Sequence, residues 1–406
     1  MKINKVKKIL FSLFILAIPF DNYNIFSQFS ASDIFLIFLL LFLLINFLLL
    51  KVKFEWNNIN TLLMLLLFWF ILSFFSSENL DISLRTLITS VMIFLVLFIT
   101  IYYSNSSKAL KSTYWIIIIA GIISATTGII QWIAYKKLGI ILWDPVLYYS
   151  DLTNSIVFRV TGSYYDPNFY TLYLIIPMIL SLMIIVEKKF FTHRERIYAF
   201  FSLMMIMIPY ILSFSRAGWV VLAVFSFCFV FRRLKITGRI FLFSSVVIVL
   251  ITGVVSKLFY NILHFNYEST MQRFTVAVYS LRTIFSHPIN GIGLGVRIFN
   301  PYTGYRMETH NTFLQVGTYA GLFALIVFVT IIFYIFYYGI QTYKILKGTK
   351  DGVILEGYIW AFSSCVLGML TLNGLFLKHF WIVGGLIVSS YLMIKKGKYE
   401  IEKFNK

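Results

Sequence analysis

The sequence predicts an all-α polytopic membrane protein with about twelve transmembrane helices. Of its 406 residues, 60% are hydrophobic and only 13% are charged, whereas a soluble domain is about 25% charged. Apolar runs of roughly 17–25 residues recur, and each is long enough to cross a hydrocarbon core of about 30 Å. Segments that cross lipid must satisfy their backbone hydrogen bonds internally, which favours helices.

The predicted spans follow one another along the whole chain, 1–406, which we interpret as a single membrane domain. They are 8–20, 34–50, 59–76, 84–103, 114–134, 169–186, 197–214, 218–231, 240–258, 312–338, 353–372 and 380–394. The first run is short and follows the basic stretch KINKVKK, a pattern that also fits a signal peptide. Because no clear A-x-A cleavage site follows it, we expect a retained helix.

The net charge of +19 is sorted by side of the membrane. Roughly two thirds of the Lys and Arg fall in alternate connections and at both ends of the chain, as the positive-inside rule predicts. This pattern places both termini, including the tail 395–406, in the cytoplasm and gives no sign of a nucleic-acid partner. The outer connections favour Arg over Lys, and Arg binds phosphate oxygens in a bidentate manner. An anionic ligand and ordinary loop charge explain that preference equally well.

Two connections are long, 135–168 and 259–311, and both fall on the outer side. Loops longer than about 12–15 residues are usually functional or disordered, and the aromatic content of these two argues against disorder. Within the second, Ser269 to Phe285 predicts an amphipathic helix at the outer membrane interface. Its apolar face is expected to hold Met271, Val278 and Leu281.

Two polar features border predicted spans. The turn SFSRAGW places Arg216 at the edge of the hydrocarbon, where an arginine is costly unless it faces a wet cavity or a partner. A snorkelling side chain is the alternative. The stretch ETHNTFLQVGTYAGL places His310 at the outer end of the span 312–338, where the pair Gly317 and Gly321 would let a neighbouring helix approach closely. An imidazole held there is suited to taking a proton from a hydroxyl.

Several other chemistries are excluded or weak. GIGLGVR (Gly291 to Arg297) mimics a phosphate-binding loop, but no βαβ unit surrounds it, so we expect a turn that packs close to the membrane helices. Glu308 and His310 have no third or fourth metal ligand at suitable spacing, and no G-x-S-x-G elbow is present. We therefore expect no metal and no cofactor.

At this point the motifs resemble a known family. HNTFLQVGTYAG resembles the H-N-x-x-L-x6-G signature of the O-antigen ligase and polysaccharide polymerase superfamily. FRVTGSYYDPN, SRAG and HPINGIGLG resemble further landmarks of that family in the same order, over roughly 159–325. One position departs from some family patterns, because Ala324 stands where a small or aromatic polar residue is found.

The resemblance implies a glycosyltransferase on the outer face of the bacterial cytoplasmic membrane. Its donor would be a glycan on a polyprenyl diphosphate, and its acceptor a sugar hydroxyl. A ligase would use lipid A core and a polymerase the growing polysaccharide, and the residues leave this choice open. Transfer with inversion and without a metal is also implied.

The resemblance matches Arg216, Arg273 and His310 to catalytic residues of the family. The chemistry of these residue types agrees, because arginines can stabilise a diphosphate leaving group and a base can add about 10²–10⁴-fold. We expect Arg216 and Arg273 to hold the diphosphate and His310 to position or deprotonate the acceptor. The expected substrate-binding residues are Arg159, Asn168, Arg282 and Asn311. For Asn311, helix capping is the stronger alternative.

A secondary transporter or flippase of the cell envelope is the alternative function. Transporters carry intramembrane carboxylates or interrupted helices near the midplane. Here the spans are nearly free of acids, with Glu356 the main exception, so the sequence favours the transferase.

Overall fold

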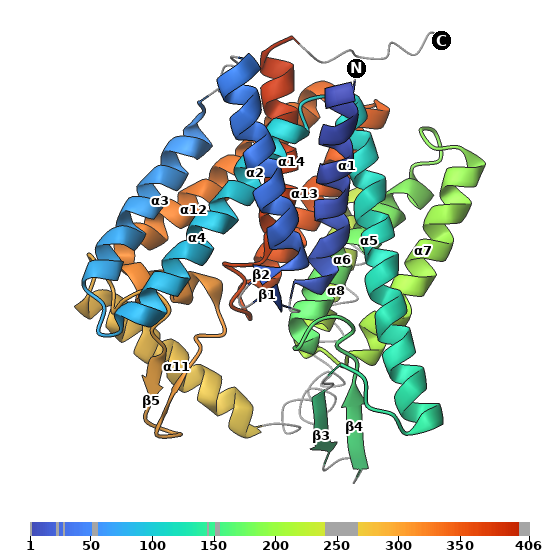
Figure 1. Ribbon diagram of the computed structural model, residues 1–406. Helices are drawn as coiled ribbons and strands as arrows, with labels where there is room; N and C mark the ends of the chain where they lie inside the picture. The colour runs from blue at the N-terminus through green and yellow to red at the C-terminus, as the bar shows by residue number, and fades with distance from the viewer. Residues whose placement is uncertain are drawn as a thin grey trace.

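The computed structural model describes residues 2–21, 24–26, 29–50, 56–143, 146–150, 155–239 and 267–397. Within these ranges the chain is a bundle of helices, and the first residues of α1 and the last residues of α14 lie at the same end of it (Figure 1). The helices are α1 (Lys2–Ala17), η1 (Ile18–Phe20), α2 (Ala31–Leu50), α3 (Asn58–Phe75), α4 (Leu80–Tyr103), α5 (Ser107–Ile133), η2 (Ala134–Leu138), α6 (Pro167–Val186), α7 (His193–Leu212), α8 (Arg216–Arg233), α11 (Tyr267–Ser286), α12 (Thr312–Leu346), α13 (Lys350–Gly368) and α14 (Lys378–Lys395).

The helices confirm the predicted class. A helix occupies every predicted span except 240–258, which lies outside the described residues. Among the described residues, seven helices, α2 to α7 and α12, are long and apolar enough to cross a membrane. The protein is therefore a mostly helical, multi-span membrane protein, and the count of twelve spans stays a prediction.

Helix α6 is the most deeply enclosed of these seven. In its most apolar stretch 78% of the residues are buried, against 22% for α2. It is apolar around its whole circumference, as expected for a helix surrounded by others, and it contacts α5, α7, α8 and α13. The start of α6 is consequently a fixed point from which polar side chains can be positioned.

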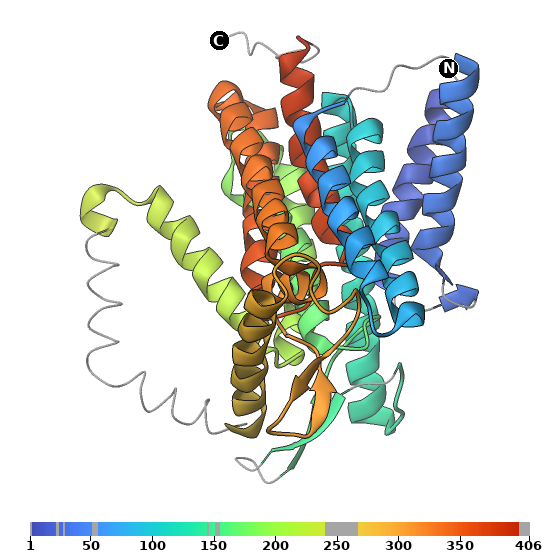
Figure 2. The same ribbon diagram turned by 90° about the vertical axis from the view of Figure 1, so that its left-hand side faces the viewer.

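In the part of the chain that the structure describes, three antiparallel hairpins accompany the helices, a feature that the all-α prediction did not include. They are β1 (Asn24–Phe26) with β2 (Phe29–Ser30), β3 (Val146–Ser150) with β4 (Ser155–Arg159), and β5 (Ile298–Asn300) with β6 (Tyr305–Met307). The second and third lie in the predicted outer connections, where backbone groups outside the helices pair locally. They lie with α11 at the end of the bundle away from the termini (Figures 1 and 2).

Helix α11 confirms the helix predicted over Ser269 to Phe285. Leu281, on the face predicted to lie against the membrane, is exposed on the protein surface, and Val276, Ser280 and Ile284 form a separate, buried face. This face packs on α12. A Cβ on Gly317 would lie 2.6 Å from the Ile284 side chain, so the predicted close approach at this glycine is confirmed, with α11 as the neighbour.

The helix of the predicted span 312–338 is interrupted at one point. Helix α12 leaves helical geometry at Ala320 and at Gly321, whose φ is 85°. A Cβ on Gly321 would lie 2.4 Å from the Pro288 carbonyl oxygen, and Leu322 N donates to that same oxygen at 2.7 Å. Gly321, the second glycine of the pair, therefore allows the turn after α11 to pack against α12, and it interrupts α12.

The glycine-rich turn 291–297 fills this interruption. Ile292 N donates to Thr318 O at 2.9 Å, and Gly293 N donates to Tyr319 O at 3.3 Å. A Cβ on Gly291 would lie 2.4 Å from both carbonyl oxygens. The prediction of a turn packed close to the membrane helices is confirmed, and the turn satisfies carbonyls that the break in α12 leaves free.

We predict that Gly321→Ala destabilises the protein far more than Gly304→Ala. Both glycines have positive φ, 85° and 73°, but a Cβ on Gly304 meets nothing within 4 Å. The positive φ costs an alanine about 1–2 kcal/mol at Gly304. At Gly321, whose ψ of 179° lies in a region essentially restricted to glycine, the backbone strain costs about 1–3 kcal/mol, and the clash with Pro288 adds about 1–3 kcal/mol. Thermal melts in detergent compare the two variants, and equal shifts of the midpoint would contradict this account of the break.

Candidate active site

The predicted tight turn between α7 and α8 is confirmed, and buried serines hold it. Ser215 caps α8, with its Oγ accepting from Gly218 N at 3.1 Å. The same hydroxyl donates to Asn168 Oδ1 at 2.7 Å. Because Asn168 belongs to the first turn of the enclosed helix α6, Arg216 is fixed at the start of α8.

Arg159, the last residue of β4, ties the first outer connection to the same turn. Its Nε donates to Ser213 O at 2.9 Å, and its Nη2 lies 3.4 Å from Asn168 Oδ1. Arg159, Asn168 and Arg216 were predicted as site residues from two separate stretches of sequence, FRVTGSYYDPN and SRAG. The structure brings the three together.

Arg273 and His310 belong to the same environment. Burial lowers the pKa of Arg273, the charge of Arg216 lowers it further, and Asp166 opposes both. Burial also lowers the pKa of His310, followed by the charge of Arg273. The charge of Arg216 thus acts on Arg273, and that of Arg273 acts on His310. We refer to these three residues as the Arg–His cluster.

The protonation of His310 follows from this environment. The carboxylates of Glu308 and Asp166 raise its pKa, but burial and Arg273 prevail, so the net shift is downward. At neutral pH the imidazole is therefore predominantly neutral. A neutral imidazole beside guanidinium groups can accept a proton while the arginines bind an anion.

Asp166 is a site residue that the sequence prediction missed. It caps α6, and its Oδ1 accepts from Asn168 N at 2.6 Å and from Phe169 N at 3.4 Å. Its carboxylate acts on both Arg273 and His310. The signal was present, because Asp followed by Pro at the first helical position is typical of a helix start.

Asn373, in the connection between α13 and α14, holds the segment that carries His310. Its Oδ1 accepts from Asn311 N at 3.0 Å and from Thr309 Oγ1 at 2.8 Å. Its Nδ2 donates to Glu308 Oε2 at 2.7 Å. His310 lies between these contacts with φ of 50°, which is uncommon for a residue other than glycine. A lone Asn in a short turn has no sequence signature, and the prediction missed it.

Asn311 caps α12, which confirms helix capping, the stronger of its two predicted roles. Its Oδ1 accepts from Phe313 N at 2.9 Å and from Leu314 N at 3.0 Å, and its Nδ2 donates to Leu370 O at 3.0 Å. Both polar ends of the side chain thus have protein partners. Substrate binding by Asn311 stays a prediction.

Arg282 is not brought into the cluster. It is exposed on α11, with its guanidinium 5.2 Å from the centre of the Tyr279 ring. It follows Arg273 by nine residues, which turns it roughly 180° around the helix. Its assignment to substrate binding also stays a prediction.

Glu308 is engaged on both carboxylate oxygens, by Arg297 Nε at 2.8 Å and by Asn373. Over the ranges given above, no three His, Cys, Asp or Glu side chains are grouped as metal ligands would be. Glu308 therefore acts on the neighbouring His310 through its charge and helps to hold its segment.

The bundle and the Arg–His cluster define a multi-span membrane protein with a half-buried, positively charged polar site. Residues 199–329 match the family described as O-antigen ligase. The match contains all three residues of the cluster, whereas Arg159 and Asn168 precede it. It confirms the predicted resemblance to the O-antigen ligase-like superfamily and supports a membrane enzyme of surface polysaccharide assembly. No curated protein matches the chain.

We predict that Asn373→Ala lowers stability more than Asn79→Ala. The first change removes three hydrogen bonds around His310, at about 1 kcal/mol for each bond. The second removes one exposed helix cap, at about 1 kcal/mol. Thermal melts report stability, and hydrogen exchange at the start of α12 should accelerate only in Asn373→Ala. Unchanged exchange there would show that Asn373 does not hold this segment.

Proposed function

We propose that the protein is a membrane glycosyltransferase that moves a glycan from a polyprenyl diphosphate carrier to a sugar hydroxyl. The observation that supports this most directly is the convergence of the Arg–His cluster from three separate segments, α8, α11 and the start of α12. The family match over the same segments agrees with it.

The donor diphosphate would bind to Arg216 and Arg273. Guanidinium groups bind phosphate oxygens through paired, charge-assisted hydrogen bonds. Arg216 is also the first residue of α8, and a helix N-terminus adds partial positive charge. Arg159 and Asn168 contribute by fixing this turn. In this proposal the arginines stabilise the charge that develops on the leaving diphosphate, so the reaction needs no metal.

The acceptor hydroxyl would lie against His310. The neutral imidazole takes the hydroxyl proton while the oxygen forms a bond to the anomeric carbon. The bond from that carbon to the diphosphate oxygen breaks, and the electron pair leaves with the polyprenyl diphosphate. A single displacement of this kind inverts the anomeric configuration. The acceptor sugar belongs to lipid A core in a ligase and to the growing polysaccharide in a polymerase.

The site would face the outside of the cytoplasmic membrane. It lies at the end of the bundle away from the first residues of α1 and the last residues of α14 (Figure 1), which the charge pattern assigns to the cytoplasm. A lipid-linked glycan would therefore be used after its transfer across the bilayer.

Glu356 is the acid within the spans that a transporter would most readily use, but its carboxylate is bound by other side chains. Glu356 forms an ion pair with Arg232 at 3.0 Å and accepts from Tyr343 Oη at 3.0 Å. These contacts join α8, α12 and α13 in a structural network. This favours the transferase over a transporter or flippase.

We predict that His310→Ala lowers kcat for glycan transfer about 10²–10⁴-fold through loss of the base. Arg216→Ala should lower it about 10²–10³-fold through loss of charge stabilisation. Transfer from purified lipid-linked donor in proteoliposomes measures both effects.

The control for these variants is Arg306→Gln. Arg306 is an exposed arginine of the outer connection 259–311, which also contains His310, and it lies 3.3 Å from Glu78. Because such a surface ion pair is weak, its loss should leave transfer within about twofold of the wild type. Near-normal turnover in both His310→Ala and Arg216→Ala would remove the catalytic assignment.

Transfer should also depend on pH through His310. Only the neutral imidazole accepts a proton, so the rate rises with pH as His310 deprotonates. Burial and Arg273 hold its pKa below the ordinary 6.5, which places the acid limb of the profile below that value. Arg273→Gln removes a charge that lowers the pKa, so the limb should move to higher pH. Profiles of kcat/KM measure the shift, and a limb that stays in place or moves to lower pH would contradict the coupling.

A further inference from the structure

A polar cavity lies beside the Arg–His cluster, between α4, the start of α6 and the start of α14. Its volume is about 340 Å³, and Tyr165 and Asn373 are among its lining residues. Asn373 also holds the segment of His310, and Tyr165 directly precedes Asp166. The cavity and the candidate active site therefore share these residues as a wall.

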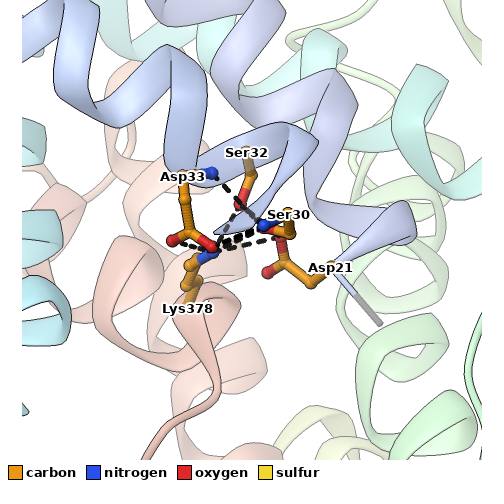
Figure 3. A network of polar contacts seen from close by, with 5 residues as sticks. All are labelled: Asp21, Ser30, Ser32, Asp33 and Lys378. Carbon is orange, nitrogen blue, oxygen red and sulfur yellow. Dashed lines mark hydrogen bonds and ion pairs between the residues drawn. The ribbon is translucent and has the colours of Figure 1, made fainter. Parts of the chain in front are cut away.

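The charges around the cavity cancel. Figure 3 shows Lys378 directed at two carboxylates, with its Nζ 2.7 Å from Asp33 Oδ1 and 3.1 Å from Asp21 Oδ1. Ser32 Oγ accepts from the same Nζ at 2.6 Å. A buried ammonium requires such partners, so its charge is neutralised within the protein. Arg85 also lines the cavity, and the two bases balance the two acids. A diphosphate would be repelled by the two carboxylates of this cavity, whereas a neutral ligand would be neither attracted nor repelled by a net charge.

His379 provides an unsatisfied polar group at the cavity. Its side chain lines the cavity and is only 5% exposed. Its Nε2 has no hydrogen-bond partner among the described residues, although nearly all buried polar groups have one. The ring lies edge-on to Tyr173 at 5.5 Å. A ligand hydroxyl in the cavity would supply the partner that this nitrogen lacks.

Aromatic rings form a further part of the wall, beside the aliphatic side chains of α4. Tyr164, Tyr165, Phe169 and Phe376 line the cavity, and the rings of Tyr165 and Phe169 meet edge-to-face at 6.1 Å. Small-molecule sites combine such apolar surfaces with a few placed polar groups. A sugar ring presents the matching chemistry, since it has C–H groups on its faces and hydroxyls around its edge.

We propose that this cavity binds one sugar ring of the glycan substrate, with hydroxyls on His379 and Arg85 and one ring face against Tyr165 and Phe169. The proposal rests on the proposed function and adds a sugar-binding subsite beside the reacting groups. The ring belongs either to the acceptor or to the donor glycan, and the two sources share this chemistry.

Binding of a lipid-free sugar tests the cavity without turnover. The probe is the oligosaccharide released by mild acid from the host's polyprenyl-linked glycan, titrated into the full-length protein in nanodiscs. Arg85→Gln removes a charged donor and should raise Kd about tenfold or more. His379→Phe keeps the ring against Tyr173 and removes both nitrogens, so it should raise Kd at least about fivefold without lowering the melting temperature. Lys137→Gln, at an exposed residue away from the cavity, should leave Kd unchanged.

Two outcomes of this titration would overturn the proposal. In one, the wild type binds the oligosaccharide and both cavity variants bind it equally well, which places the sugar elsewhere. In the other, the wild type shows no binding at millimolar concentrations. Either result is separate from the proposed function, because transfer from the lipid-linked donor depends on His310 and Arg216 and is assayed on its own.

Steady-state kinetics distinguish the two sources of the ring. A rise in KM for the acceptor alone in His379→Phe and Arg85→Gln assigns the ring to the acceptor. A rise in KM for the lipid-linked donor alone assigns it to the donor. If neither KM changes, the cavity holds no substrate sugar and the proposal fails.

Discussion

The hydrogen-bonded joint between the segment of His310 and the turn before α14 is the contact on which the site depends. Asn373 binds residues on both sides of His310, and Asn311 fixes the start of α12 to the carbonyl of Leu370. These bonds hold an imidazole in a left-handed backbone conformation at a helix end, a strained state that persists only when the surroundings determine it. The position of the proposed base is thus set by a turn some sixty residues further along the chain.

Lys378 differs from the pair Arg216 and Arg273 in whether its charge is neutralised by protein carboxylates. Lys378 is buried against Asp21 and Asp33, where it joins the first two helices to α14 and has no charge left for a ligand. Arg216 and Arg273 lie close enough that one lowers the pKa of the other, an arrangement that repels in the absence of an anion. A diphosphate would relieve that repulsion. The Arg–His cluster therefore carries positive charge suited to an anion, whereas the neighbouring cavity has no net charge.

The sequence predicted the helices and much of the site, because apolar run length and the sorting of Lys and Arg are local properties. Sequence motifs alone pointed to Arg159, Asn168, Arg216, Arg273 and His310, which lie together in the fold, whereas Arg282 does not join them. The break in α12 was not predictable from hydropathy. It depends on Gly321 meeting a carbonyl of a distant turn. Asn373 and the Lys378 network were missed for the same reason, since each acts through partners far away in the chain.

The central claim is that Arg216, Arg273 and His310 form one site at the end of the bundle opposite the termini. A cryo-electron microscopy structure of the full-length protein in nanodiscs, with polyprenyl diphosphate bound, tests it most directly. Our account predicts phosphate oxygens within hydrogen-bond distance of both guanidinium groups, with the His310 ring facing the same space. A diphosphate bound at the end that carries the termini, or one that contacts neither arginine, would contradict it.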